Sequence, residues 1–414
     1  MSAHSGGRRR AAHPSRLSRA GLGIGRHAST PARVLLGVLA LLGLLALITV
    51  ALLWPDRSGL QALQDKAAFA PNGTTYVHAR LTDRTRTDTS GNKAAVVVLT
   101  DGPDSGHERT VQVPRPDQRS ALRAGDTLVL SRTPAAGGAT YGFFAVQRGT
   151  SLWLLTALFA LVLVAVARWR GVMALVGLAV AGAVLWWFVV PAMLAGHHPG
   201  LVALSGASVI LFVVLYTTHG LRPTTSAALA GTLGGVAVTV ALATWAVHAS
   251  RLNGVTGDAG GALMSYAPAV DFPGLLVAGV VIAGLGVLND VTITQASAVY
   301  ELRAASPDAS RLQVLRAAMR IGRDHIASTV YTIVFAYAGT ALLTLLVIRL
   351  YAQPLSLLVG TEDLAEEVVR TLVSSIGLIA AVPLTTAIAA LVADTDGAPH
   401  GHSHGHSHGH AHGD

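Results

Sequence analysis

The stretch GLLVAGVVIAGLGVLNDVTITQASAVY, residues 274–300, decides how this chain folds. Apolar and glycine residues run without a turn signal into Asn289 and Asp290, and a helical pattern then continues to Glu301 and Arg303. An apolar run of this length can cross the roughly 30 Å hydrocarbon core of a bilayer. The stretch therefore predicts a membrane-spanning helix that carries an acid near one end.

Polar side chains follow one another along this helix. At about 100° per residue, four of them share one narrow stripe: Asp290, Thr294, Ser297 and Glu301. An acid within a membrane helix is costly unless it faces a partner or a water-filled cavity, so the stripe is a candidate transport or coupling site. The alternative is that Asp290 simply marks where the helix leaves the lipid. The sequence leaves both interpretations open.

The composition extends the membrane assignment to most of the chain. Of 414 residues, 51% are hydrophobic and only 13% are charged, whereas soluble domains carry about 25% charged residues. Eight stretches are long and apolar enough to cross a bilayer: about 34–54, 151–167, 171–194, 200–217, 225–247, 272–290, 326–348 and 371–393. We therefore expect a polytopic α-helical membrane protein. Its first span is an anchor, because the apolar run is too long for a signal peptide and no small-residue cleavage pattern follows.

Segment 55–150 differs in kind from the rest. Short runs rich in Val, Thr, Tyr and Phe alternate with turn signals: 74–82, 94–100, 108–113, 125–132 and 140–147. They predict a small β-rich extracytoplasmic domain, an antiparallel barrel or sandwich, between the first and second spans. The domain could bind a ligand, dock a partner or act as a stabilising cap. His78 and His107 stand alone and resemble ordinary surface residues.

The distribution of arginine predicts the orientation. Arginines are concentrated in the leader 1–33 and in alternate short loops: Arg168, Arg170, Arg222, Arg303, Arg311, Arg316, Arg320 and Arg323. The other short loops hold only Arg251, Arg349 and Arg370. The positive-inside rule then places both termini in the cytoplasm, and segment 55–150 is too long to count against it. The pI near 10.3 follows from this topology and requires no nucleic acid as a partner.

Within the seven-span membrane domain, 151–393, the cytoplasmic segment 301–325 is basic. Ser306 and Pro307 predict a helix start. The helix that follows presents three arginines on one side: Arg316, Arg320 and Arg323. We expect an amphipathic helix in contact with anionic inner-leaflet lipids, with a partner-docking helix as the alternative.

Smaller features concern packing. Gly231 and Gly235 lie four residues apart, which predicts close helix packing or a helix that slides or hinges. Pro383 predicts a kink in the last span. His219 and Arg222 resemble ordinary loop residues. No homo-oligomeric state follows from the sequence.

The tail 394–414 alternates histidine with small residues: His400, His402, His404, His406, His408, His410 and His412. Such a tail binds divalent transition metals adaptably, but it also arises as neutral low-complexity sequence. The chain contains no cysteine, which excludes disulfides and thiol chemistry. We expect no required cofactor.

Three stretches resemble the YibE/F-like family of bacterial membrane proteins: Arg148–Gly171 (RGTSLWLLTALFALVLVAVARWRG), Pro191–Gly196 (PAMLAG) and above all Gly286–Arg303 (GVLNDVTITQASAVYELR). The resemblance covers roughly residues 70–393. It implies a small outer domain followed by a multi-span unit in a bacterial cytoplasmic membrane. It transfers no catalytic residues, because the family has no established biochemical activity.

No nucleophile elbow, phosphate loop, HExxH or paired-carboxylate motif occurs in the sequence, so we do not expect an enzyme. The leading hypothesis is a permease for a small solute or ion, with Asp290 and its stripe as the coupling element. The alternative is a membrane scaffold or sensor that relays a signal from the outer domain to the arginine-rich cytoplasmic helix.

Overall fold

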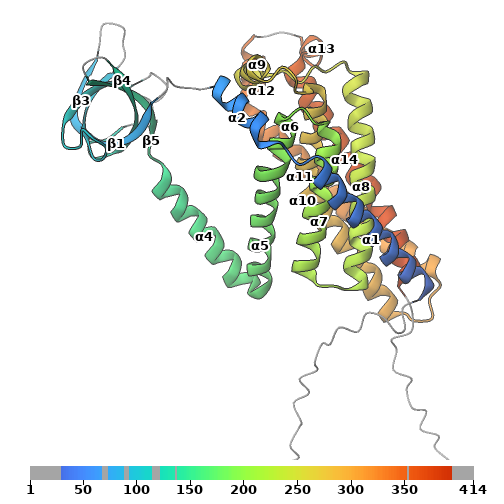
Figure 1. The fold of residues 1–414 in the computed structure, drawn as a ribbon. Coiled ribbons are helices and arrows are strands. Elements are labelled where there is room, and N and C mark those ends of the chain that lie inside the picture. The colour runs from blue at the N-terminus through green and yellow to red at the C-terminus, as the bar shows by residue number, and fades with distance from the viewer. Residues whose placement is uncertain are drawn as a thin grey trace, which may run out of the picture.

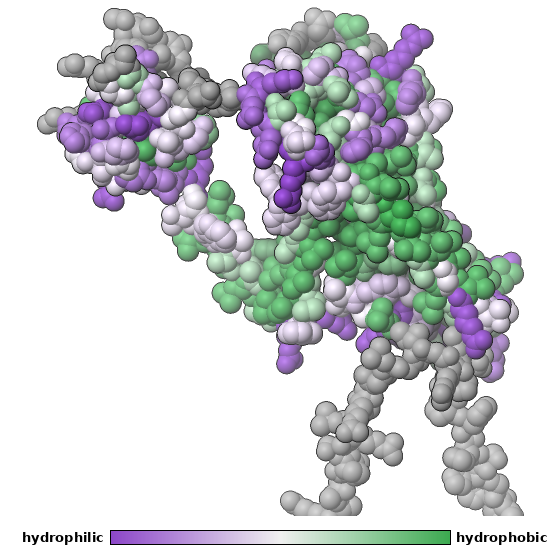
Figure 2. All heavy atoms as spheres, in the orientation of Figure 1, coloured by the Kyte–Doolittle hydropathy of each residue, from purple (hydrophilic) through white to green (hydrophobic). Residues whose placement is uncertain are grey.

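A computed structural model describes residues 29–67, 73–87, 93–113, 122–135, 138–351 and 354–393. The chain forms a helical bundle and a small antiparallel β-sheet, joined by α4 (Figure 1). Figure 2 shows that apolar side chains dominate the middle of the bundle on the visible face, between two more polar ends. This distribution is the one expected of helices that cross a bilayer.

Seven helices in the described residues are long and apolar enough to cross a membrane. They are α1 (Thr30–Leu52), α4 (Gly149–Ala167), α5 with its continuation (Trp169–Leu194), α7 (Pro199–His219), α8 (Pro223–Ala249), α10 (Phe272–Ala305) and α14 (Glu362–Val392). An eighth span is present if α11 (Arg311–Thr340) and α12 (Leu342–Tyr351), which meet at a 61° bend, count as one. The span expected at 326–348 therefore falls on this bent pair of helices.

Two spans contain a proline beyond their first turn and respond to it differently. α5 proper (Trp169–Val184) passes into a π-helical turn, η1 (Leu185–Val189), and then into α6 (Val190–Leu194) with Pro191 near its start. Proline has no N–H to donate, and a π-turn is one way a helix accommodates the missing hydrogen bond. α14, in contrast, remains one helix through Pro383.

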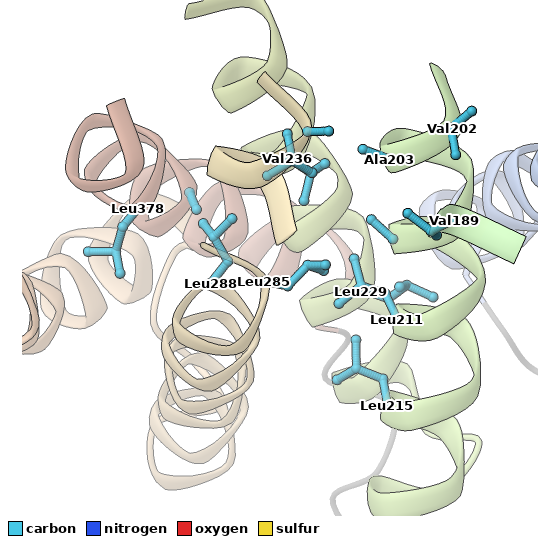
Figure 3. Packing of buried hydrophobic residues seen from close by; sticks show 14 of the residues in the cluster. Val189, Val202, Ala203, Leu211, Leu215, Leu229, Val236, Leu285, Leu288 and Leu378 are labelled. Carbon is cyan, nitrogen blue, oxygen red and sulfur yellow. The ribbon is translucent and has the colours of Figure 1, made fainter. Parts of the chain in front are cut away.

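The helices at the centre of the bundle are α8, α10 and α14, which pack closely against one another. Figure 3 shows the aliphatic side chains that meet there, among them Leu229 of α8, Leu288 of α10 and Leu378 of α14. A side chain at Gly231 would collide with Thr385, so glycine is needed for this approach of α8 to α14. The expectation of close packing at Gly231 is confirmed.

The outer helices are much less buried. α4 buries no residue, and it leans away from the bundle in Figure 1. α1 crosses the bundle surface and buries only Leu39 and Ala46. These helices present aliphatic side chains outward, as lipid-facing helices do.

The basic segment differs from its expected form. α10 runs to Ala305, and α11 begins at Arg311 after the N-cap Ser310, whose side chain forms a capping box with Gln313. The helix start expected at Ser306 is therefore wrong by four residues. α11 continues unbroken to Thr340, so the basic turns and the apolar turns belong to one helix.

The β-sheet contains five strands in the order β3-β2-β1-β4-β5. They are β1 (Thr75–Thr87), β2 (Lys93–Leu99), β3 (Glu108–Val113), β4 (Thr127–Ala135) and β5 (Gly138–Val146). All neighbouring pairs are antiparallel, and β3 also contacts β5, so the sheet curls into a barrel (Figure 1). The expected antiparallel sheet is confirmed.

The barrel has an aliphatic interior, in which Val97, Leu128 and Leu130 are fully buried. Polar contacts lie outside it. Asp104 accepts hydrogen bonds from the Tyr141 hydroxyl and from Arg132 Nε, the latter at 3.3 Å. These two donors hold the pKa of Asp104 below its ordinary value. The contacts tie the β2–β3 connection to β4 and β5.

Short helices occupy the end of the bundle opposite the α7–α8 turn (Figure 1). They are α2 (Arg57–Lys66), α9 (Gly257–Tyr266), α12 and α13 (Leu355–Leu358). At this end Glu362 accepts a hydrogen bond from the backbone N–H of Asn253 at 2.5 Å, and Glu366 is buried beside Thr256. The acidic start of α14 thereby fixes the loop between α8 and α9.

Candidate functional site

A polar cavity of about 280 Å³ lies where α7 turns into α8. Its basic lining residues are Arg170 of α5, His219 of α7 and Arg222 of the turn. Hydroxyl groups come from Thr218, Thr224, Thr225, Ser297 and Tyr300, and Glu301 of α10 adds a carboxylate. Four helices and one turn contribute, so the cavity depends on the packing of the bundle. We call it the turn pocket.

The structure divides the stripe expected on α10. Ser297 and Glu301 line the turn pocket, whereas Asp290 and Thr294 do not. Thr294 donates its hydroxyl hydrogen to the backbone carbonyl of Asp290 at 2.8 Å. The Asp290 side chain is exposed on the surface of the bundle. The stripe is therefore not one continuous site. Ser297 and Glu301 belong to a pocket, whereas Asp290 and Thr294 lie on an open face of the helix.

The depth of Asp290 follows from a contact between α8 and α10. The hydroxyls of Thr232 and Thr292 are 2.6 Å apart. Thr232 stands well inside α8, which begins at Pro223; at 1.5 Å per residue it lies roughly 13 Å from that end. Asp290 precedes Thr292 by half a turn and lies slightly deeper. It is thus placed within the length of the bundle, away from its end.

A column of buried and half-buried polar side chains from α8, α10 and α14 runs through the bundle beside α11. Beside the Thr232–Thr292 pair, Gln295 donates hydrogen bonds to the Ala318 carbonyl at 3.0 Å and to the Thr386 hydroxyl at 2.8 Å. The Asn289 amide oxygen is buried and has no partner among the described residues. We call Thr232, Asn289, Thr292, Gln295 and Thr386 the polar column.

Sequence reasoning identified Ser297 and Glu301 of the turn pocket, but it missed the other residues of the pocket and the whole polar column. Gln295 was passed over because it lies outside the stripe through Asp290, although Asn289, Thr292 and Gln295 recur every three residues in an apolar helix. His219 and Arg222, interpreted as loop residues, line the turn pocket. The available signal was topological: alternating spans bring Arg170 and Arg222 to the same end of the bundle.

The other basic residues of that end have separate environments. Arg303 is buried, donates from Nη1 to the Ala309 carbonyl at 2.5 Å and leaves its Nε without a partner among the described residues. Arg316 and Arg320 line a second cavity, of about 580 Å³, at the α10–α11 turn, and Arg323 is exposed on α11. The three arginines expected at a lipid surface are thus all accessible from outside the bundle.

The structure provides no test of metal binding by the tail. His400, His402, His404, His406, His408, His410 and His412 all lie outside the described residues. Within the described part of the chain, no group of three or more His, Asp or Glu side chains could hold a metal ion. The metal-binding tail remains a prediction.

Comparison with known proteins identifies the family. The sequence pattern that defines the YibE/F-like proteins matches residues 155–395, more than half of the chain. The chain belongs to the YibE/F-like family, and the resemblance is confirmed for the membrane domain; residues 70–154, to which it was expected to extend, lie outside the match. No curated protein and no solved structure matched the chain. Family membership and the apolar helices together indicate a multi-pass membrane protein.

Proposed function

We propose that this YibE/F-like protein is a permease that moves a small solute or ion through the bundle of α8, α10 and α14. The polar column supports the proposal most strongly. Aliphatic side chains would suffice to pack these helices, yet hydroxyl and amide groups meet at their centre. Polar side chains inside a membrane bundle commonly mark a pathway or a binding site.

Asp290 is the proposed coupling residue. It lies on α10 beside the polar column, and its carboxylate is exposed within the length of the bundle. Gly286 and Ala283, one and two turns before it, are exposed on the same helix and are small. A charge at this depth is tolerated where water reaches it, so we expect a water-filled recess along this face of α10.

The orientation completes the proposal. We infer from the arginine distribution that both termini and the turn pocket face the cytoplasm and that the barrel lies outside the cell, with the protein in a bacterial cytoplasmic membrane. The proposed role requires neither enzymatic activity nor binding of nucleic acid.

Cysteine accessibility tests whether Asp290 faces water. The chain has no cysteine, so a single introduced thiol reports on its own position without a modified background. Asp290→Cys should react with a charged, membrane-impermeant maleimide in vesicles of known orientation. The matched control is Leu158→Cys on α4, whose native side chain is 55% exposed and apolar. That thiol should react only with a lipid-soluble maleimide.

Equal protection of Asp290→Cys and Leu158→Cys from the charged reagent would place Asp290 against lipid or protein and would reject the permease proposal. If Asp290→Cys does react with the charged maleimide, complementation of a deletion strain then tests whether Asp290 is needed for function. Asp290→Asn keeps the size of the side chain and removes its charge, so it should fail to complement at matched membrane levels.

A scaffold or sensor is the second candidate, and one observation favours it. α11 is unbroken from the basic turns at Arg316 to Thr340, where it bends into α12. A displacement of the basic end would therefore be transmitted along a rigid helix to the opposite end of the bundle. Protection of Asp290→Cys from water together with loss of complementation in Arg316→Gln would favour this candidate.

A further inference from the structure

We propose that the turn pocket binds a phosphate group, carried either by an anionic lipid or by free inorganic phosphate. The inference concerns a binding site and does not depend on whether the chain transports a solute. Arg170 approaches from the start of α5 and Arg222 from the α7–α8 turn. Among the described residues neither arginine forms an ion pair, so both guanidinium groups are available to an anion.

The start of α8 provides further donors. Its N-cap is Arg222, whose side chain does not cap the helix, and Pro223 follows within the first turn. The backbone N–H groups of Thr224 and Thr225 therefore have no acceptor within the helix. The positive end of the helix dipole and these N–H groups favour an anion at this position, and both threonines line the pocket.

Buried hydroxyl groups give an independent indication of a ligand. Thr218 lines the turn pocket, and its hydroxyl oxygen is buried and has no hydrogen-bond partner among the described residues. Thr225 is only 1% exposed, lines the same pocket and makes no side-chain hydrogen bond within the described chain. Buried polar groups are rarely left without partners. A phosphate oxygen would satisfy both hydroxyls.

The size and position of the pocket fit this ligand class. A volume of about 280 Å³ is at the lower limit of ordinary ligand pockets and suits one small polar group. Basic pockets between membrane helices at the cytoplasmic side bind lipid headgroups. Ile293 is the one aliphatic residue of the lining, so the pocket does not enclose an acyl chain, and a bound lipid would insert only its headgroup.

The negative charge of Glu301 would repel a bound anion, and this repulsion provides a test of the proposal. Glu301 lines the pocket together with the two arginines. For an anion, Glu301→Gln removes a repulsion and should strengthen binding several-fold. For a cation, the same change should weaken binding. The sign of the effect therefore identifies the charge of the ligand.

The experiment uses the full chain in nanodiscs. Native mass spectrometry counts retained phosphatidylglycerol, with phosphatidylcholine discs as the uncharged reference, and calorimetry measures binding of inorganic phosphate in the phosphatidylcholine discs. The double variant Arg170→Gln and Arg222→Gln should lower affinity for the ligand that binds by about tenfold or more, because charge-assisted bonds to both guanidiniums are lost. Binding of phosphatidylglycerol alone assigns a lipid headgroup, and binding of inorganic phosphate assigns the free anion.

The control is Arg251→Gln, which removes one exposed arginine from the loop at the opposite end of the bundle. It should change neither measurement. If Arg251→Gln lost as much affinity as the double variant, the loss would be an effect of net charge, and the turn pocket would be rejected as the binding site. Unchanged binding in the double variant, or weaker binding in Glu301→Gln, would also overturn the proposal. Since Glu301→Gln is expected to gain affinity, misfolding cannot produce its predicted result.

Discussion

The barrel and the bundle of this protein are built from different interiors. The buried side chains of the barrel are aliphatic: Val77, Ala79, Leu81, Ala95, Val97, Leu99, Val111, Val113, Leu128 and Leu130. Every buried polar or charged side chain among the described residues lies in a bundle helix, and Thr232, Thr292 and Gln295 are fully or almost fully buried. One chain thus uses two kinds of core.

The difference follows from the solvent of each part. In water, removal of apolar surface drives folding, so the barrel gains most from an interior of branched aliphatic side chains. Lipid tails are as apolar as leucine, so contact between aliphatic side chains does not by itself drive helices together. Small residues and interhelical hydrogen bonds take over that role. Gly231 against Thr385 and Thr232 against Thr292 are instances.

The largest effect should come from truncating the barrel core. Leu130 is fully buried, and Leu130→Ala should destabilise the barrel by about 2–5 kcal/mol, a large part of the stability of so small a domain. Limited proteolysis of the full chain, with mapping of the cleaved bonds, should show rapid cleavage within 73–146 and an intact bundle.

Leu155→Ala on α4 is the matched control, because Leu155 is 63% exposed on a helix that buries no residue. It should leave the proteolysis pattern unchanged. Simultaneous cleavage of the bundle in Leu130→Ala would show that the two cores are coupled and do not fold independently.

A smaller effect should follow removal of the Gln295 amide. Gln295→Met keeps a similar shape and loses the bonds to Ala318 and Thr386. Hydrogen bonds between membrane helices contribute about 0.6 kcal/mol each on average, so the bundle should lose about 1 kcal/mol. Unfolding in mixed detergent micelles measures it. Thr244→Val, which removes an exposed hydroxyl bonded within its own helix, should cost less; an equal cost would deny Gln295 an interhelical role.

The same contrast explains which parts of the structure the sequence could predict. The strands alternate and end at Gly, Pro and Asn, so their ends were found within about five residues. Long apolar runs located the spans, but polar turns extend several of these helices: α14 begins at Glu362 where 371 was expected, and α10 ends at Ala305 where 290 was expected. The helix start predicted at Ser306 was wrong because Pro307 was taken as the start signal. The Ser310–Gln313 capping box, which marks the observed start, can also be recognised in the sequence. The error at Ser306 concerns a local signal and is four residues in size.

The turn pocket and the polar column could not be predicted in the same way. The Thr232–Thr292 contact joins positions sixty residues apart, and nothing local to either threonine distinguishes a buried hydroxyl from one that faces lipid. The division of the stripe at Thr294 likewise depends on α7 and α8, which enclose Ser297 and leave Asp290 open. Helical periodicity groups residues on a face; the neighbouring helices decide what that face meets.

A double-mutant cycle on Thr232 and Thr292 would measure how much one interhelical hydrogen bond contributes to the stability of the bundle. Thr→Val conserves shape at each position. Each hydroxyl also bonds a carbonyl of its own helix, Ala228 and Asn289 respectively, so the coupling between the two should be modest, about 0.6 kcal/mol. The cycle is measured by unfolding in mixed micelles. Strictly additive single changes would show that the 2.6 Å contact contributes nothing to stability.

The smallest effect concerns the exposed carboxylate of the barrel, where water screens the interaction. Asp101 accepts the His78 backbone N–H at 2.5 Å and lies 2.6 Å from His78 Nδ1. The hydrogen bonds with His78 hold the pKa of Asp101 below its ordinary value of 3.8. A carboxyl group whose pKa is lowered by folding stabilises the native state above the unfolded pKa and loses that contribution as pH falls through the folded pKa.

Asp101→Asn should therefore lower barrel stability slightly at neutral pH and flatten its decline in acid, below about pH 4. Proteolytic susceptibility of 73–146, followed with an acid-active protease between pH 2 and 5, measures this decline. Asp65→Asn on α2, outside the barrel, should retain the wild-type profile. A profile for Asp101→Asn that coincides with wild type would show that the His78 contact is too solvated to contribute, leaving the aliphatic interior to account for the stability of the barrel.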